Sequence, residues 1–213
     1  MSANVETMFY VREKPWHGLG TPVMEAPGSA DALVWAGLNW KVIQKEVRTE
    51  DGDWIAGYKA NVRSTDGSVL GIVSDRYKVV QNEDAFRFTD ELLGEGVTYE
   101  TAGSLQYGRK VWMLARMPQR YIIAGDEIEP YLVIMSSHDG SSGVKVAMTP
   151  IRVVCQNTLN LALNSANRIW TARHTENVLS RVREASETLR LAERYMSELG
   201  RGVNELAKIK LSD

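Results

Sequence analysis

Short runs of alternating apolar and polar residues, separated by glycine-containing turns, constrain the fold of this chain most strongly. Two runs, Trp40 to Arg48 and Ile55 to Ser64, flank Glu50-Asp51-Gly52-Asp53, and Thr65-Asp66-Gly67 leads into a third run, Val69 to Val80. Alternation with period two is typical of half-buried strands, and Asp-Gly pairs between such runs are typical of hairpin turns. The pattern therefore predicts three consecutive antiparallel strands.

Helices are predicted on both sides of these strands. Ser29-Ala30-Asp31 is a typical helix start before the apolar segment Ala32 to Leu38, whereas the residues before it read as an irregular opening rich in Pro and Gly. Asn82 is predicted to cap a helix over Glu83 to Leu93. The first half of the chain thus has the predicted order α-β-β-β-α.

A second set of strands follows and ends in another helix. The predicted strands are Val97 to Thr101, Lys110 to Met117, Tyr121 to Ile123, Tyr131 to Ser137 and Val144 to Met148. Thr149-Pro150 then combines a preferred N-cap residue with proline at the first helical position, so a helix is predicted from Pro150 to Ala166. These patterns indicate an α+β fold with an antiparallel sheet built from strand-strand-strand-helix units.

The terminal segment has a different pattern. From Glu176 onward, apolar residues repeat at alternating spacings of three and four, which is the heptad spacing of a helix that packs along one seam. The seam residues are Val182, Ala185, Leu189, Ala192, Met196, Leu199, Val203 and Leu206. We therefore expect a core domain at 1–175 and a heptad-like helix at 176–213, whose seam either folds back on the sheet or pairs between copies in a homo-oligomer.

Composition excludes several classes of protein. The chain has 213 residues, a net charge of −2 and a single cysteine, Cys155, so a disulfide framework and a multi-cysteine zinc site are excluded. No apolar run approaches the roughly 20 residues that span a bilayer, and no signal-peptide pattern opens the chain. The usual motifs of ATP hydrolysis, Rossmann cofactors and α/β-hydrolases are absent. We therefore expect a cytoplasmic protein with no membrane contact and no cofactor.

The middle of the chain carries the charge pattern that bears on function. The 35 residues from Ser141 to Thr175 contain no carboxylate, yet they include several cations. These cations are Lys145, Arg152, Arg168 and Arg173. An anion-binding surface needs such a stretch, because a nearby carboxylate would weaken its field within a Debye length. A solvated polar face formed by chance is the alternative.

One face of the predicted helix strengthens the anion-binding interpretation. Arg152, Gln156, Asn160 and Asn164 are spaced four residues apart and therefore lie on one side. Amides and an arginine without acids can meet phosphates, sugars and base edges, and the helix N-terminus adds free N–H groups. An ordinary solvated helix would favour Glu and Lys over Asn, which is a poorer helix former.

Three further cations and one aromatic residue complete the predicted binding set. Lys145, Arg168 and Arg173 would supply charge to a nucleic-acid backbone, and Trp170 would stack on a base. Together with the helix face, they predict contact with a single strand.

Cys155 keeps an enzyme among the alternatives. It lies next to the apolar face of its helix, which favours a buried, inert thiol. The helix N-terminus and Arg152 would lower the pKa of an accessible thiol and make it a nucleophile. We assign no catalytic and no metal-binding residues. His138-Asp139 is expected to form a turn, and Trp16-His17-Gly18-Leu19-Gly20 a structured turn that caps the sheet.

Three segments together resemble the uncharacterised phage- and plasmid-like proteins that spread by lateral gene transfer. They are Trp16 to Gly20, Asp75 to Asn82 and Thr149 to Leu159. The resemblance covers most of the chain up to Thr175, and it implies a mobile-element setting without a settled activity. The order of antiparallel strands and a basic helix is also similar in architecture to single-strand annealing proteins of the RecT and Erf types, which bind single-stranded DNA as rings or filaments.

These observations predict a single-stranded nucleic-acid-binding protein of a phage or mobile element. We expect it to promote strand annealing or recombination as a homo-oligomer, with single-stranded DNA as its partner, and not to be an enzyme. An interaction protein that binds a host partner through the terminal helix is the alternative, and a small cysteine hydrolase is the third.

Overall fold

A seven-stranded sheet forms the centre of the computed structural model, which describes residues 3–94, 97–117, 121–123, 126–166, 168–175, 177–181 and 183–190. Its strands are β1 (Val5–Val11), β2 (Thr21–Val23), β6 (Tyr99–Leu105), β7 (Lys110–Arg116), β10 (Tyr131–Ser137), β11 (Val144–Thr149) and β12 (Ile169–Ala172). They lie in the order β12-β11-β10-β7-β6-β1-β2. Every neighbouring pair is antiparallel except β1 and β2. The predicted α+β class with antiparallel sheets is confirmed.

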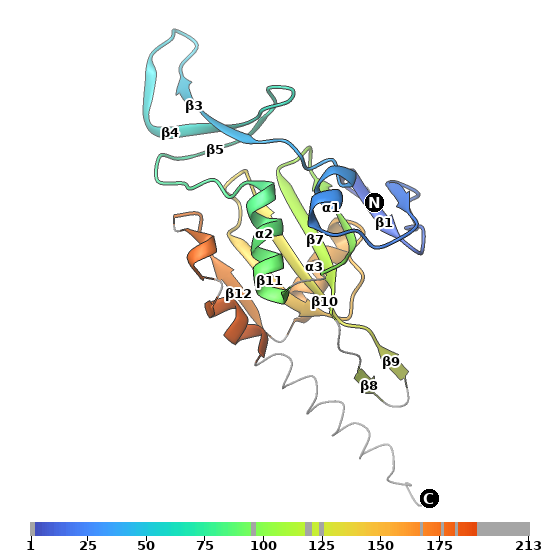
Figure 1. Ribbon diagram of the computed structural model, residues 1–213. Helices are drawn as coiled ribbons and strands as arrows, with labels where there is room; N and C mark the ends of the chain where they lie inside the picture. The colour runs from blue at the N-terminus through green and yellow to red at the C-terminus, as the bar shows by residue number, and fades with distance from the viewer. Residues whose placement is uncertain are drawn as a thin grey trace, which may run out of the picture.

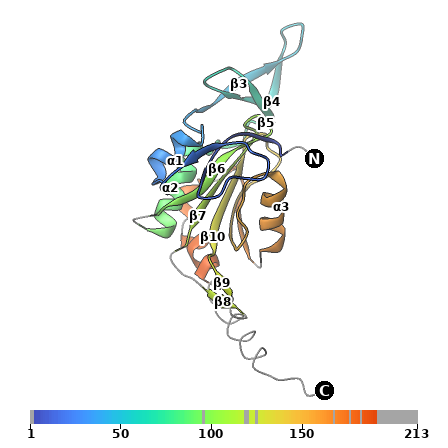
Figure 2. The same ribbon diagram turned by 90° about the vertical axis from the view of Figure 1, so that its right-hand side faces the viewer.

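Helices cover both faces of this main sheet, as Figure 2 shows. α1 (Ser29–Trp35) and α2 (Asn82–Leu93) lie on one face, and α3 (Gln156–Ser165) lies on the other. Alternation along β7 supplies both interfaces: Met113 belongs to the core under α1 and α2, whereas Trp112 belongs to the core under α3. Each large side chain buried in this way contributes about 1.5–3 kcal/mol to stability.

A second sheet projects from one end of the main sheet, as Figure 1 shows, and we call it the arm. It consists of β3 (Val42–Arg48), β4 (Trp54–Arg63) and β5 (Val69–Ser74) in that order. The close approach of Gly71 fixes the arm against the body, since a Cβ there would lie 2.5 Å from the Cα of Asp139. A separate hairpin, β8 (Tyr121–Ile123) with β9 (Asp126–Ile128), extends from the opposite end (Figure 1).

Four predictions about local structure are wrong. The strand predicted to run to Val80 ends at Ser74, and the N-cap of α2 is Gln81 instead of Asn82. Two segments also differ in kind from the prediction. The opening segment predicted to be irregular contains β1, which lies between β6 and β2 and buries Phe9 completely. The helix predicted from Pro150 begins only at Gln156, because residues 150–155 run along the sheet, where the Thr101 hydroxyl donates to the Val153 carbonyl at 2.6 Å. Both errors involve segments whose conformation depends on partners far away in the chain.

The terminal segment folds back on the sheet as far as the structure describes it. After β12, η1 (Val178–Arg181) and helical residues 183–190 follow, and Ala185 and Leu189 are buried in the core under α1 and α2. Val182 and the seam residues from Ala192 onward lie outside the described residues. No helix among the described residues is long and apolar enough to cross a membrane.

Candidate nucleic-acid interface

The residue before α3 has an extended backbone, and a hydrogen bond to a side chain caps the helix. Cys155 has φ −161° and ψ 176°, and its N–H donates to the Thr158 hydroxyl at 3.0 Å. The helix then packs Leu159, Ala162 and Leu163 against the sheet. The remaining side faces outward, so the sheet fixes which residues of α3 are accessible.

The outward side of α3 carries amides and no charged side chain. Asn160 and Asn164 are exposed, and Gln156 is half-buried. The Gln156 amide nitrogen donates to the Asn160 oxygen at 2.9 Å, and the Gln106 amide donates to the Gln156 oxygen at 3.2 Å. Three of the predicted contact residues therefore share one helix surface, with Gln156 and Asn160 already oriented by hydrogen bonds.

Three predicted cations lie on or next to the neighbouring strands. Lys145 of β11 is half-buried and pairs in register with Thr171 of β12. Because Val144 and Val146 point into the core under α1 and α2, Lys145 points to the α3 face. Arg168 and Arg173 are exposed at the two ends of β12.

Trp170 is not placed to stack on a base. It is 3% exposed, its ring stacks on Phe88 at a centroid distance of 5.3 Å, and Arg181 lies 5.2 Å from its ring centroid. The alternation of β12 turns residue 170 toward the α2 side, into the core. The arginines near Trp170 in the sequence do not indicate that its side chain is buried. Trp170 is therefore not part of the interface.

Arg152 occupies a different position from the one expected on the helix. It precedes α3, and its guanidinium donates from Nε to Glu100 at 2.9 Å and from Nη2 to the Val11 carbonyl at 2.6 Å. Its side chain is 21% exposed. Arg152 is therefore part of a partly buried ionic network, and the prediction that it lies on the face of the helix with Gln156 is wrong.

We call this network the Glu100 cluster; it comprises Arg12, Arg116 and Arg152 around Glu100, whose side chain is completely buried. Arg116 approaches the carboxylate at 2.7 Å and Arg12 at 3.1 Å. Burial acts to lower the pKa of Arg12, but hydrogen bonds to Glu100 and Glu129 outweigh it, so the pKa is raised and the guanidinium stays charged. Sequence analysis missed Arg12 and Arg116, because strand register alone brings them to Glu100.

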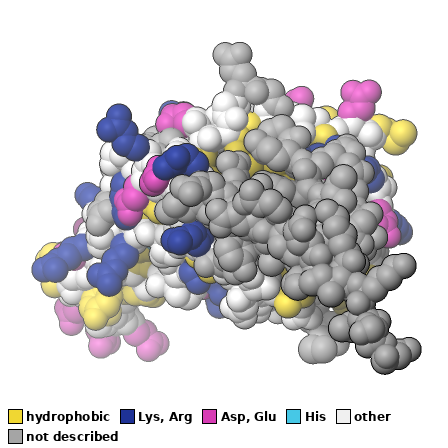
Figure 3. All heavy atoms as spheres, turned by 90° about the horizontal axis from the view of Figure 1, so that it is seen from below, with side chains coloured by type: hydrophobic (Ala, Val, Ile, Leu, Met, Phe, Trp, Pro, Cys, Tyr) yellow, Lys and Arg dark blue, Asp and Glu magenta, His cyan; other side chains and the backbone are white. Residues whose placement is uncertain are grey.

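The helix α2 on the opposite face of the sheet differs from α3 in charge. α2 carries Glu83, Asp84, Asp90 and Glu91 against one cation, Arg87. Figure 3, which views the molecule from below, shows several Lys and Arg side chains toward one side, with Asp and Glu side chains among them. The two helices therefore differ in charge, since α3 is neutral and α2 is net negative.

The thiol of Cys155 is buried, as predicted. His17 reaches the same loop, but its Nε2 lies 2.8 Å from the Val154 carbonyl and its Nδ1 accepts the Leu19 N–H at 3.1 Å. These contacts fix the ring as the Nε2–H tautomer and occupy both nitrogens. The geometry gives no support to a thiol activated by His17. In the described part of the chain, no group of three or more His, Cys, Asp or Glu residues could hold a metal ion.

A neutral polar network joins the arm to the α2 side of the body. The Asn61 amide donates to the His138 carbonyl at 2.7 Å, and His138 Nε2 lies 2.9 Å from the Asn82 oxygen. Since the Asn82 amide nitrogen donates to the Leu38 carbonyl, its oxygen accepts from His138. Burial, followed by repulsion from His174, lowers the pKa of His138 to about 3, so the ring is neutral.

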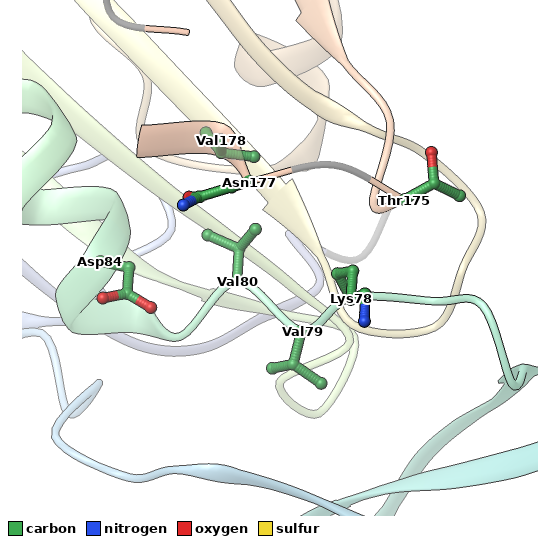
Figure 4. A pocket seen from close by; sticks show the side chains of 7 residues that line it. All are labelled: Lys78, Val79, Val80, Asp84, Thr175, Asn177 and Val178. Atoms are coloured by element: carbon green, nitrogen blue, oxygen red, sulfur yellow. The ribbon is translucent and has the colours of Figure 1, made fainter. Parts of the chain in front are cut away.

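A pocket of about 260 Å³ lies beside this network, between the start of α2 and η1 (Figure 4). Its lining residues are Lys78, Val79, Val80, Asp84, Thr175, Asn177 and Val178. The Lys78 N–H donates to the His174 carbonyl and so joins two of the segments that line the pocket. Several of these residues belong to the segment that follows β5 and fastens the arm, so the pocket sits at a structural joint.

Comparison with known protein families places these segments in a family. The family model described as "Domain of unknown function (DUF932)" matches residues 69–213. The chain belongs to the DUF932 family. Within the chain, the DUF932 region begins at β5 and contains the arm joint, α3 and two of the three arginines of the Glu100 cluster. No curated protein and no solved structure matches the chain.

Proposed function

We propose that this DUF932 protein binds single-stranded nucleic acid across the α3 face of its main sheet. The charge difference between the helices α3 and α2 carries the proposal: α3 has no charged residue, whereas α2 has four carboxylates and one arginine. Asn160 and Asn164 would contact the strand with their amides, and Lys145, Arg168 and Arg173 would supply charge to its backbone.

The position of α3 favours a single strand over a duplex. Helices that read duplex DNA insert into the major groove with their N-terminal residues at the base edges. Here the Gln156 N–H donates to the Ala3 carbonyl at 3.2 Å, so the N-terminus of α3 is covered by the chain. The accessible surface is the outward side of a helix lying flat on a sheet, along which an extended strand can run.

The setting we propose is a cytoplasmic protein of a phage or other mobile element that promotes strand annealing or recombination without a cofactor. The resemblance of Trp16 to Gly20, Asp75 to Asn82 and Thr149 to Leu159 to phage- and plasmid-like proteins supports this setting. Annealing requires two strands to meet, which favours assembly of several copies along the nucleic acid.

A mobility-shift assay with matched single- and double-stranded oligonucleotides at two salt concentrations tests the proposal. We expect tighter binding to the single strand and a log–log salt slope of about −0.7 for each phosphate neutralised. A detectable complex with a flat salt response would contradict the electrostatic argument, and equal affinity for the duplex would contradict the strand preference.

The arm favours a second candidate, a protein that binds a protein partner. In the arm, Ile43, Val62 and Val69 lie opposite one another in register, as do Ala60 and Ile72, and of these Val62 and Ala60 are buried. Several large apolar side chains of the arm are exposed, namely Ile43, Trp54, Tyr58, Val69 and Ile72. Contiguous exposed apolar surface marks interaction sites in soluble proteins. This surface would serve equally for self-association.

Light scattering at micromolar concentration separates these uses of the arm. A homo-oligomer that becomes monomeric in an Ile43→Ser, Ile72→Ser variant supports self-association through the arm. If the wild type is a monomer and still binds single strands, strand binding does not require self-association through the arm.

A further inference from the structure

The Glu100 cluster has more positive charge than its own carboxylates neutralise. Three guanidiniums surround Glu100, and Glu129 accepts from Arg12 at 3.1 Å. Among the described residues, the three positive and two negative charges of the cluster leave one positive charge in excess. The arginine side chains are 45%, 32% and 21% exposed for Arg12, Arg116 and Arg152, so this excess faces solvent.

The hydrogen bonds of the cluster leave donors available on its solvent side. Glu100 Oε1 accepts from Nε of Arg152 and Arg12, and Oε2 accepts from Arg116 and Arg12. The carboxylate oxygens are thereby saturated. Among the described residues, the Nη1 groups of Arg116 and Arg152 make no hydrogen bond, so a ligand oxygen can be met by guanidiniums whose orientation Glu100 already fixes.

The backbone of Arg12 is held in an uncommon conformation at this position. Its φ is +65°, in the left-handed region that side chains with a Cβ rarely adopt. Its guanidinium also donates to the Tyr131 hydroxyl at 3.0 Å. Such a conformation persists only where the surroundings determine it, and such residues concentrate at functional sites.

We propose that the Glu100 cluster binds one phosphodiester group of a nucleic-acid backbone. The identity of the polymer rests on the function proposed above, whereas the preference for an oxyanion rests on the cluster alone. A phosphodiester carries one negative charge and balances the single excess positive charge, and guanidiniums bind phosphate oxygens in bidentate fashion. The cluster lies on the α3 side of the sheet, since Tyr131 belongs to the core under α3.

Salt-dependent binding of a labelled oligothymidine to the full chain tests the proposal. Arg116→Gln removes one exposed donor group while Arg12 and Arg152 still neutralise Glu100. We expect the variant to bind more weakly and its log–log salt slope to be less steep by about 0.7, the contribution of one phosphate on a single strand. The matched control is Arg87→Gln on α2, which removes the same charge from the other face and should leave the slope unchanged. An unchanged slope in Arg116→Gln overturns the inference and leaves the proposed function intact.

A second measurement separates failure of the cluster from failure of the proposed function. Inorganic phosphate is titrated against wild type and Arg116→Gln at constant ionic strength, with melting temperature as the readout. If the wild type binds no single strand, the proposed function fails, yet phosphate stabilisation of the wild type alone still supports an oxyanion site. An equal change of melting temperature with phosphate in the wild type and in Arg116→Gln overturns the oxyanion site. If Arg116→Gln does not fold, the Nε–Hε NMR signals of Arg116 and Arg152 in the wild type decide, because oligothymidine or phosphate must shift them.

Discussion

Buried polar groups are paired in different ways on the two faces of the main sheet. On the α3 face, Glu100 is buried among three arginines and the network is ionic. On the α2 face, His138, Asn82 and Asn61 form a neutral network that fastens the arm. The outer surfaces differ in the same sense, because α3 carries amides and α2 carries carboxylates. The helices on the two sides of one sheet therefore present surfaces of different charge.

The largest effect is expected from disrupting the Glu100 cluster on the α3 face. Arg152→Glu places a second carboxylate beside the completely buried Glu100 and removes the hydrogen bond to the Val11 carbonyl. We expect a loss of about 3–5 kcal/mol in the free energy of unfolding, measured by urea denaturation. Arg173→Glu, at an exposed position, should change stability by no more than about 0.5 kcal/mol. An unchanged melting temperature in Arg152→Glu would show that the cluster does not support the fold.

The second effect is a pH dependence of stability that comes from the neutral network on the α2 face. The pKa of His138 is lowered to about 3 in the folded chain, so the unfolded chain binds more protons once the pH falls below about 6.5. Stability is therefore fully present above that pH and is lost as the pH falls toward 3. We expect a loss of about 2 kcal/mol between pH 7 and pH 5.

His138→Gln tests the origin of this dependence. The variant should show a flatter stability profile between pH 7 and pH 5, even though it is less stable at pH 7. A profile as steep as that of the wild type would assign the pH dependence to other groups. The pKa of His174 is also lowered, chiefly by burial, so a smaller slope in the same direction should remain.

The third effect comes from a variant that gives α3 exposed carboxylates, as α2 has. Asn160→Glu with Asn164→Glu adds two negative charges at exposed helix positions. We expect single-stranded DNA to bind about tenfold more weakly at low salt, a difference of about 1.4 kcal/mol. Arg87→Glu changes the charge of α2 by the same amount and should alter affinity less than about twofold, roughly 0.4 kcal/mol. Equal losses in the two proteins would show that net charge, and not the α3 face, controls binding.

The smallest effect concerns Cys155. Its buried thiol caps α3 together with Thr158, and serine is a preferred N-cap residue, so Cys155→Ser combines a better cap with a buried hydroxyl. We expect melting to change by the equivalent of about 1 kcal/mol or less and strand affinity to stay unchanged. Loss of an activity in a folded Cys155→Ser protein would favour the hydrolase alternative.

Local pattern determined much of this fold. Alternating residues and Asp-Gly turns predicted β3, β4 and most of the main sheet, because period-two burial and turn chemistry depend on adjacent residues. The acid-free stretch from Ser141 to Thr175 is likewise a property of the sequence. The stretch holds exposed arginines at both ends of β12, but it also holds Trp170, which the core buries.

Tertiary structure decided which of those residues reach the surface. Glu100 is 52 residues from Arg152 and 88 from Arg12 along the chain, so no local pattern could report that they share one carboxylate. Contact with the sheet, including the hydrogen bond from the Thr101 hydroxyl to the Val153 carbonyl, accompanies the extended residues 150–155, and α3 begins at Gln156. Propensity and capping act over a few residues, whereas contacts with the sheet act between segments far apart in the chain, so the helix start predicted at Pro150 was wrong.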